Sequence, residues 1–470
     1  MKIHKYSVIA LSTLVMLYSS GCQKQLDIKP VDQVEQNDAI KTSKDVQGVL
    51  IGAYTAATLR GLYGGRLQST TDFLADDGDF SYFGTFNEYT ELSDKAVTIV
   101  NQFVEGVWDT GYNTIGVCNN VLAHIDLVDE VNKKRVEGEA RFLRGMVYFD
   151  LVKAFGRDWN DTNGSPTTNQ GVPIVLTPTT TIAGIQKVSR NTVAEVYAQA
   201  IADLKVAEAN LDVSNGVYAT SGAASAVLAR IYLQQKNYAE AETEASKVIA
   251  SGRYSLIEHF ADEFQYPGQA THVFNTAEDI FAVQISNQSG FNALNEVYAA
   301  VAYGGREETY VNDQHFARYE SGDTRADMFF DDDGEFTTKF NNLFGNVVVI
   351  RFAEMYLIRA EARSQKASPD YAGAAADLNV VRKRAGISNI VPATSAAGWI
   401  DVVERERRVE LPFEGFRLAD LKRYKKSTNS VDGDGNVVDT FPWNSPKLIF
   451  PIPKRERDAN PNLTQNEGYQ

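Results

Sequence analysis

The sequence predicts a mainly α protein, a tetratricopeptide-like helical superhelix with inserted loops and small β hairpins. In residues 221–254, small and aromatic residues fall at the relative positions of the tetratricopeptide repeat, and a second stretch from Phe352 repeats this pattern loosely. The first copy carries Leu228, Ala229, Tyr232 and Ala241. The second copy has Tyr356 and Ala374 in the matching places, with an insertion between its two helices. Periodicity alone therefore supports two helix pairs.

Residues 351–424 carry the clearest helical signals. An apolar stripe runs along the first predicted helix through Phe352, Met355, Tyr356 and Ala360. Ser368 and Pro369 are typical of the start of a second helix, which Gly386 can close in the left-handed conformation. A third helix is predicted from about Ala396 to Leu411, because the proline that follows restricts the residue before it.

The third helix carries charges of alternating sign on all sides. They are Glu404, Arg405, Glu406, Arg407, Arg408 and Glu410. We expect these groups to form ion pairs that hold helices together. Acid–base catalysis by two carboxylates is the alternative, but nothing in this stretch sets two carboxylates apart from their arginines.

Three stretches of this region, RFAEMYLIRAEA, NVVRKRAGI and ERRVELPFEGFRLADLKRY, resemble the C-terminal signature of the SusD/RagB family. Members of that family are surface lipoproteins of Bacteroidota that capture nutrients, mostly glycans. The resemblance implies about four helix pairs in a right-handed superhelix, with helices 46–58 and 112–124 and helices 135–155 and 191–211 as the further pairs. It also implies a SusC-like TonB-dependent transporter in the outer membrane as the partner.

The first 21 residues are predicted to be a signal peptide. Lys2 and Lys5 form a basic start, residues 8–18 form a short apolar core, and small residues precede Cys22. Gly21-Cys22 suggests a lipoprotein processing site, so we expect lipid attached to Cys22 to anchor the chain. The short charged tract at 23–27 resembles the one that sends such lipoproteins to the outer face of the cell, which implies an outer-membrane location facing the cell exterior. A secreted protein with an unpaired Cys22 is the alternative.

The mature chain is predicted to be one SusD-like domain, 22–470. Its parts are an N-terminal part 22–211, the repeat 221–254, a loop- and strand-rich insertion 255–345, and the C-terminal signature 351–470. Residues 280–285 are predicted to form a strand and residues 329–340 a hairpin around Asp333-Gly334.

Composition excludes several classes of function. A formal net charge of −15 argues against a nucleic-acid-binding surface. The two cysteines are Cys22 and Cys118, so lipidation of the first leaves no internal disulfide. The sequence contains no serine-hydrolase, zinc-protease or nucleotide-binding motif, and the 5 histidines never fall at metal-ligand spacing. Binding is favoured over catalysis.

Residues 61–94 and 286–310 are predicted to be long loops that build the binding face. Both are rich in glycine and aromatic residues, and a loop of this length is usually functional or disordered. Aromatic faces stack on sugar rings, while planar amide and guanidinium groups bind hydroxyls. The candidate ligand-binding residues are Tyr82, Phe83, Phe86, Tyr298, Tyr303 and Arg306.

Two other functions remain open at this stage. A tetratricopeptide scaffold at the cell envelope would bind peptides or proteins instead of glycans. A glycoside hydrolase would need two exposed carboxylates in an aromatic cleft, for which Asp76, Asp77 and Asp79 are the candidates.

No cofactor is expected, with one weak candidate for a calcium ion. Asp432, Asp434 and Asn436 have the first three spacings of a calcium-binding loop, but the glycine at the sixth place is missing and Trp443 occupies the twelfth. An Asp-Gly turn is the simpler interpretation.

Overall fold

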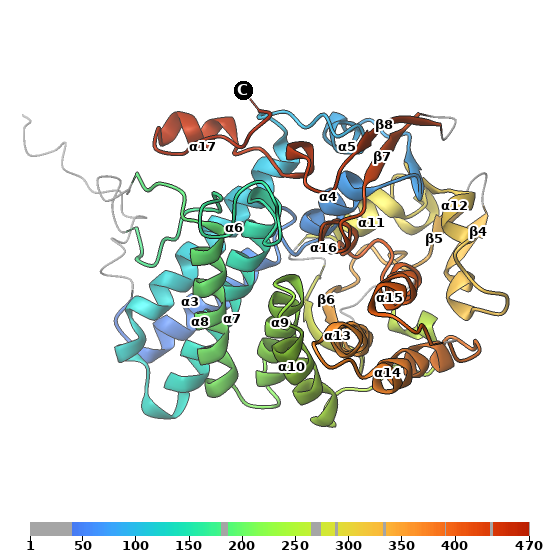
Figure 1. Ribbon diagram of the computed structural model, residues 1–470. Helices are drawn as coiled ribbons and strands as arrows, with labels where there is room; N and C mark the ends of the chain where they lie inside the picture. The colour runs from blue at the N-terminus through green and yellow to red at the C-terminus, as the bar shows by residue number, and fades with distance from the viewer. Residues whose placement is uncertain are drawn as a thin grey trace, which may run out of the picture. The chain divides into compact units, whose positions relative to one another are not determined.

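The computed structural model describes residues 40–179, 187–264, 274–286, 290–331, 335–390, 392–432 and 436–469. Residues from Thr42 onward form one compact unit, and most of its regular structure is α-helix (Figure 1). The predicted mainly α fold is confirmed. Within the described ranges, no helix is both long enough and apolar enough to cross a membrane.

The long helices pack in four consecutive pairs (Figure 1). The pairs are α3 (Ser43–Ala57) with α6 (Gln102–Ala123), α7 (Glu130–Phe155) with α8 (Val193–Asn210), α9 (Ser221–Gln234) with α10 (Tyr238–Ala250), and α13 (Phe352–Gln365) with α14 (Tyr371–Arg384). Contacts of α3 with α7, α8 with α9, and α10 with α13 join the pairs into one array. The structure therefore contains the two pairs that periodicity supports and the two that only the family resemblance implied.

The repeat residues of α9 and α10 show why these helices pair. Leu228, Ala229 and Ala241 are fully buried, and the small alanines allow close approach of the two helices. Tyr232 is buried with 9% of its surface exposed. In the second copy Ala374 is fully buried but Tyr356 is only half-buried.

Residues 61–94, predicted as one irregular loop, contain regular structure instead. They form α4 (Arg66–Ala75), β1 (Phe80–Tyr82) and α5 (Asn87–Ser93). The prediction was wrong because α4 is buried on nearly all sides and includes buried Gln68, Ser69 and Asp72. Such a helix has no one-sided apolar stripe from which it could be recognised.

Residues 286–310 are also more regular than predicted. The described part contains α11 (Ala293–Tyr298) and the start of β3 (Thr309–Val311). α11 is a single short helix whose N-cap, Asn292, accepts a hydrogen bond from the Leu294 amide at 2.8 Å. Six residues are too few for a periodic pattern to appear in the sequence.

The strands form small two-stranded antiparallel sheets among the described residues. The remaining strands are β2 (Asp279–Val283) with β6 (Val347–Arg351), β4 (Phe329–Asp331) with β5 (Glu335–Thr337), and β7 (Thr428–Val431) with β8 (Val437–Phe441). The strand predicted at 280–285 and the hairpin predicted at 329–340 are confirmed, although the turn between β4 and β5 lies outside the described residues. A short helix, α12 (Asp313–Phe316), follows β3.

The C-terminal region begins with the predicted three-helix arrangement. α15 (Ala396–Glu410) ends where predicted, and α16 (Arg417–Tyr424) and α17 (Lys454–Ala459) follow it. Gly386 has φ of +77°, as its position after α14 requires. The predicted start at Ser368 was wrong, because Asp370 caps α14 by accepting a hydrogen bond from the Gly373 amide at 2.8 Å.

The predicted ion pairs of this region are confirmed, and they are buried. The Arg351 guanidinium reaches Glu278 at 2.7 Å, Glu414 at 2.9 Å and Glu410 at 3.0 Å, and all four side chains are at most 7% exposed. Arg325, which is fully buried, binds Glu406 of α15 at 2.7 Å. These arginines tie the strand and loop region to the C-terminal helices.

Candidate ligand-binding surface

The two segments predicted to build the binding face are joined by backbone hydrogen bonds. β1 pairs with β3 in antiparallel register, with Phe80 opposite Val311 and Tyr82 opposite Thr309. The ladder continues one step, because the Phe83 amide donates to the Glu308 carbonyl at 2.8 Å. Residues more than two hundred positions apart in the sequence therefore share one small sheet.

Alternation along this sheet decides which side chains face outward. Phe80, Thr309 and Val311 are buried on the inner face. On the other face Phe83 is 58% exposed, and its ring packs against Tyr310 with the centroids 5.2 Å apart. The outer face of the sheet thus presents a pair of aromatic rings.

A guanidinium group extends the same region of the surface. Arg306 lies over the Phe86 ring, 4.5 Å from its centroid, and donates to Glu308 at 2.6 Å and to the Thr85 hydroxyl at 2.9 Å. Stacking and the ion pair fix the plane of the guanidinium, while its side chain stays 39% exposed. We call Phe83, Phe86, Arg306, Glu308 and Tyr310 the aromatic surface.

The other candidate residues have different places. Tyr82 faces inward at the border, where its ring packs on Phe73 at 5.4 Å and its hydroxyl donates to Glu308 at 3.3 Å. Tyr298 is 1% exposed among aromatic core residues, so the structure does not place it on a ligand-accessible surface. Tyr303 is half-buried in a short 3₁₀ turn after α11.

Two members of the aromatic surface, Tyr310 and Glu308, were missed from the sequence. Tyr310 lies between two buried residues of β3, and this alternation is the signal that identifies an outward side chain. Glu308 accepts hydrogen bonds from the Tyr82 hydroxyl, the Thr85 amide and Arg306. These contacts fix the positions of the three groups relative to one another. No local sequence signal marks that role.

The carboxylates considered for hydrolysis are engaged in structural contacts. Asp77 binds Arg408 at 2.8 Å and Arg417 at 3.1 Å, and Asp79 binds Arg318 and Arg408, each at 2.5 Å. Burial acts to raise the pKa of Asp77, but the two arginines outweigh it and lower the pKa below its ordinary value. These pairs hold the start of β1 against α15 and α16.

Asp76, the third candidate, is also held by its own loop. Its carboxylate accepts hydrogen bonds from the backbone amides of Asp79 at 2.9 Å and Gly78 at 3.3 Å. Burial raises the pKa of Asp76 to about 7, although Lys95 opposes this shift. All three carboxylates are therefore largely buried, and hydrogen bonds or ion pairs hold each of them in place.

The weak calcium candidate lies at the β7–β8 turn. The Asp432 carboxylate accepts a hydrogen bond from the Asn436 amide nitrogen of the backbone at 2.8 Å, a contact typical of a turn. Asp434 lies outside the described residues. In the described part of the chain, His, Cys, Asp and Glu form no group of three or more that could hold a metal ion.

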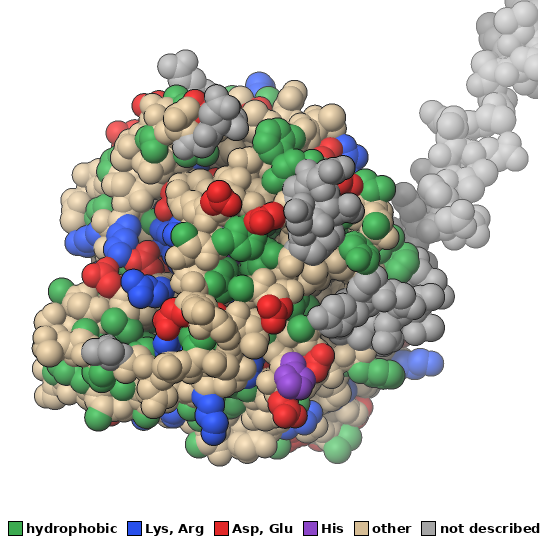
Figure 2. All heavy atoms as spheres, turned by 90° about the vertical axis from the view of Figure 1, so that its right-hand side faces the viewer, with side chains coloured by type: hydrophobic (Ala, Val, Ile, Leu, Met, Phe, Trp, Pro, Cys, Tyr) green, Lys and Arg blue, Asp and Glu red, His purple; other side chains and the backbone are tan. Residues whose placement is uncertain are grey.

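The chemistry of the aromatic surface suits a ligand with both apolar and hydroxyl-bearing faces. The side of the molecule with β4, β5 and α12 presents apolar side chains in its middle and acidic ones around them (Figure 2). Exposed rings can stack on the C–H face of a flat ligand, and Arg306, which the buried Glu308 holds in place, can bind its hydroxyl groups. Fold and surface together define a helical-repeat protein with an exposed aromatic surface.

Comparisons with known proteins identify the family. The SusD family model matches residues 319–469, and a family described as starch-binding and associating with the outer membrane matches residues 24–233. The chain belongs to the SusD/RagB-like family.

Relatives and solved structures agree with this assignment. SusD-like protein P2 of Formosa agariphila is 25% identical over 99% of this chain and 100% of its own. The starch-binding protein SusD of Bacteroides thetaiotaomicron is 24% identical over 97% of this chain and 98% of its own. A crystal structure of a candidate sugar-binding protein from Bacteroides vulgatus, 27% identical, has a TM-score of 0.78 and covers 92% of this chain and 100% of its own.

Proposed function

We propose that this protein captures an oligo- or polysaccharide at the aromatic surface, outside the cell, and delivers it to a TonB-dependent outer-membrane transporter. The observation that carries the proposal is the convergence of Phe83 and Tyr310 with the stacked Arg306 on one exposed sheet. A family described as starch-binding and a relative named as a starch-binding protein support the ligand class.

Phe83→Ala is expected to weaken glycan binding at least tenfold. The variant removes the most exposed ring of the aromatic surface, and a tenfold loss corresponds to about 1.4 kcal/mol, within the range of aromatic stacking. The fold should not change, because Phe83 is 58% exposed. A glycan array identifies the ligand, and calorimetry then compares the variant with the wild type.

Tyr218→Ala is the matched control. Tyr218 is 37% exposed and packs on Tyr54 with ring centroids 4.7 Å apart, so it offers an aromatic pair at another place on the surface. Its removal should leave the affinity unchanged. Equal affinities of Phe83→Ala and the wild type would contradict the proposed site, and an array that binds peptides but no glycan would favour the scaffold function.

The membrane attachment is proposed through Cys22. Cys22→Ala is expected to yield an unlipidated protein that is lost from the outer-membrane fraction, because a chain without acyl groups has no such anchor. Metabolic labelling with palmitate and membrane fractionation measure the two effects. Palmitate incorporation into the variant would exclude this cysteine as the lipidation site.

Delivery requires a partner, and the proposed partner is a SusC-like barrel over which this protein lies. A glycan that contacts both proteins shifts the pair toward a closed state only by its differential affinity for that state. The complex should persist in detergent, since it is expected to bury more than the roughly 1,600 Å² of a standard interface. Purification through a tag after Gln470 tests it, and recovery of this protein alone from cells that express the barrel would refute it.

A further inference from the structure

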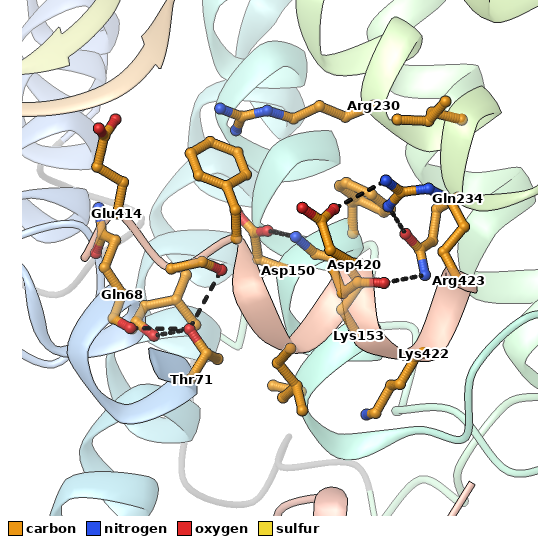
Figure 3. A pocket seen from close by; sticks show the side chains of 18 of the residues that line it. Gln68, Thr71, Asp150, Lys153, Arg230, Gln234, Glu414, Asp420, Lys422 and Arg423 are labelled. Carbon is orange, nitrogen blue, oxygen red and sulfur yellow. Dashed lines mark hydrogen bonds and ion pairs between the residues drawn. The ribbon is translucent and has the colours of Figure 1, made fainter. Parts of the chain in front are cut away.

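A cavity of about 90 Å³ lies between helices of the array and the helices α4 and α16. α4, α7, α9 and α16 supply most of its lining (Figure 3). Its wall is unusually rich in charge, with arginine, lysine and carboxylate side chains beside a few aromatic rings. Charges in such a place need partners, because a buried unpaired ion is costly.

Nearly all of the charged groups in this lining have partners. Each of five lining cations contacts a carboxylate at 2.7 to 2.9 Å, namely Lys153, Arg157, Arg230, Arg407 and Arg423. The lining carboxylate Asp158 accepts hydrogen bonds from the Gln234 amide at 2.7 Å and the Asn160 backbone at 2.8 Å. Each of these five cations therefore has a carboxylate partner, and Asp158 has hydrogen-bond donors.

Lys422 of α16 is the exception. It is only 4% exposed, and its ammonium group has no hydrogen-bond partner among the described residues. In Figure 3 its side chain extends away from Arg423, and no dashed line joins it to the other side chains drawn. The lining also contains a buried acceptor, the Gln68 side-chain oxygen, and a buried donor, Nη1 of Arg407, that are likewise unpaired in the described part of the chain.

The charges around Lys422 nearly balance. Asp158 and Asp161 favour its protonated form, while Lys153 and Arg157 disfavour it. Burial is the largest influence and lowers the pKa of Lys422 to about 8. The side chain therefore stays mainly protonated at pH 7, and among the described residues no carboxylate forms an ion pair with its positive charge.

We propose that this cavity binds a small oxyanion, a carboxylate or a tetrahedral anion such as sulfate, with the Lys422 ammonium as its principal contact. A charge-assisted hydrogen bond to the anion would satisfy the buried ammonium. A cavity of about 150 Å³ accommodates benzene, so 90 Å³ fits an anion of a few heavy atoms and is small for a sugar ring with its hydroxyls. The site is thus distinct in ligand from the aromatic surface.

Calorimetric titration of sodium sulfate, and separately of sodium acetate, into the detergent-purified protein at constant ionic strength tests the proposal. We expect saturable binding of at least one anion in the millimolar range, and the better ligand distinguishes a tetrahedral anion from a carboxylate. Lys422→Met should weaken this binding at least tenfold. Lys454→Met removes the same charge from a side chain that is 52% exposed and should bind like the wild type.

The melting temperature of Lys422→Met and the pH dependence of sulfate binding test the role of Lys422 independently. Lys422→Met should melt at a higher temperature than the wild type without added anion, because it removes an unpaired buried charge. Sulfate remains a dianion across the range, so its affinity for the wild type should fall as the pH rises above 8 and Lys422 loses its proton. No saturable binding of either anion, or equal affinity in Lys422→Met and the wild type, would overturn the proposal.

Discussion

Leu228→Asp is expected to unfold the helical array. Leu228 is fully buried in α9, which packs on α10 and α8. Loss of a buried leucine side chain costs about 2–5 kcal/mol, and a buried carboxylate without a partner adds several more. The sum approaches the whole stability of a typical domain, about 5–15 kcal/mol. Circular dichroism and thermal unfolding measure the effect.

Two variants calibrate this result. Ile51→Asp introduces the same charge on α3 at a side chain that is 56% exposed, and it should change the free energy of unfolding by no more than about 0.5 kcal/mol. Tyr356→Asp should fall between the two, because Tyr356 is half-buried. A wild-type melting temperature for Leu228→Asp would contradict the packing of the repeat.

The helical repeats could be predicted because their signals are local. Small residues at Ala229 and Ala241 and a proline after Leu411 act within one or two turns of the chain, so they can be read without knowledge of the fold. α4 escaped prediction for the opposite reason. Its Gln68 and Asp72 are polar but buried, and only contacts with distant segments make that arrangement stable.

The candidate site was predicted as two segments but not as one surface. Aromatic content drew attention to both segments, and the β1–β3 ladder places them side by side. Which ring faces outward depends on the register of that ladder. The register of the ladder cannot be derived from the sequence alone. The buried Tyr298 was therefore predicted as a ligand contact together with the exposed Phe83, and Tyr310 was not predicted.

The sequence indicated that α15 forms ion pairs, but it did not indicate which residues are the partners. The alternating charges of α15 indicated salt bridges, and the structure shows that their partners come from other elements. Glu410, for example, binds Arg325, Arg351 and Arg384. These long-range contacts link the strand and loop region to the C-terminal helices, so the loss of one arginine affects several buried carboxylates.

Arg351→Leu is expected to destabilise the protein by about 3–5 kcal/mol at pH 7. Arg351 is 1% exposed and contacts Glu278, Glu410 and Glu414, so its removal leaves buried carboxylates with fewer cations. Urea unfolding at pH 7 measures the loss. Arg405→Leu is the matched control, because Arg405 lies on α15 with an exposed side chain and should change stability by no more than about 0.5 kcal/mol.

The pH dependence of Arg351→Leu separates charge from packing. Burial acts to raise the pKa of Glu410, but Arg384, Arg351 and Arg325 outweigh it and lower the pKa to about 2. A lowered folded-state pKa stabilises the protein above the ordinary value of about 4.3, and this contribution is lost as the pH falls toward 2. Without Arg351 the pKa of Glu410 and Glu414 should rise, so both can bind protons at pH 4 and relieve the unpaired charge. The difference between variant and wild type should therefore be smaller at pH 4 than at pH 7, and equal differences at both values would assign the loss to packing alone.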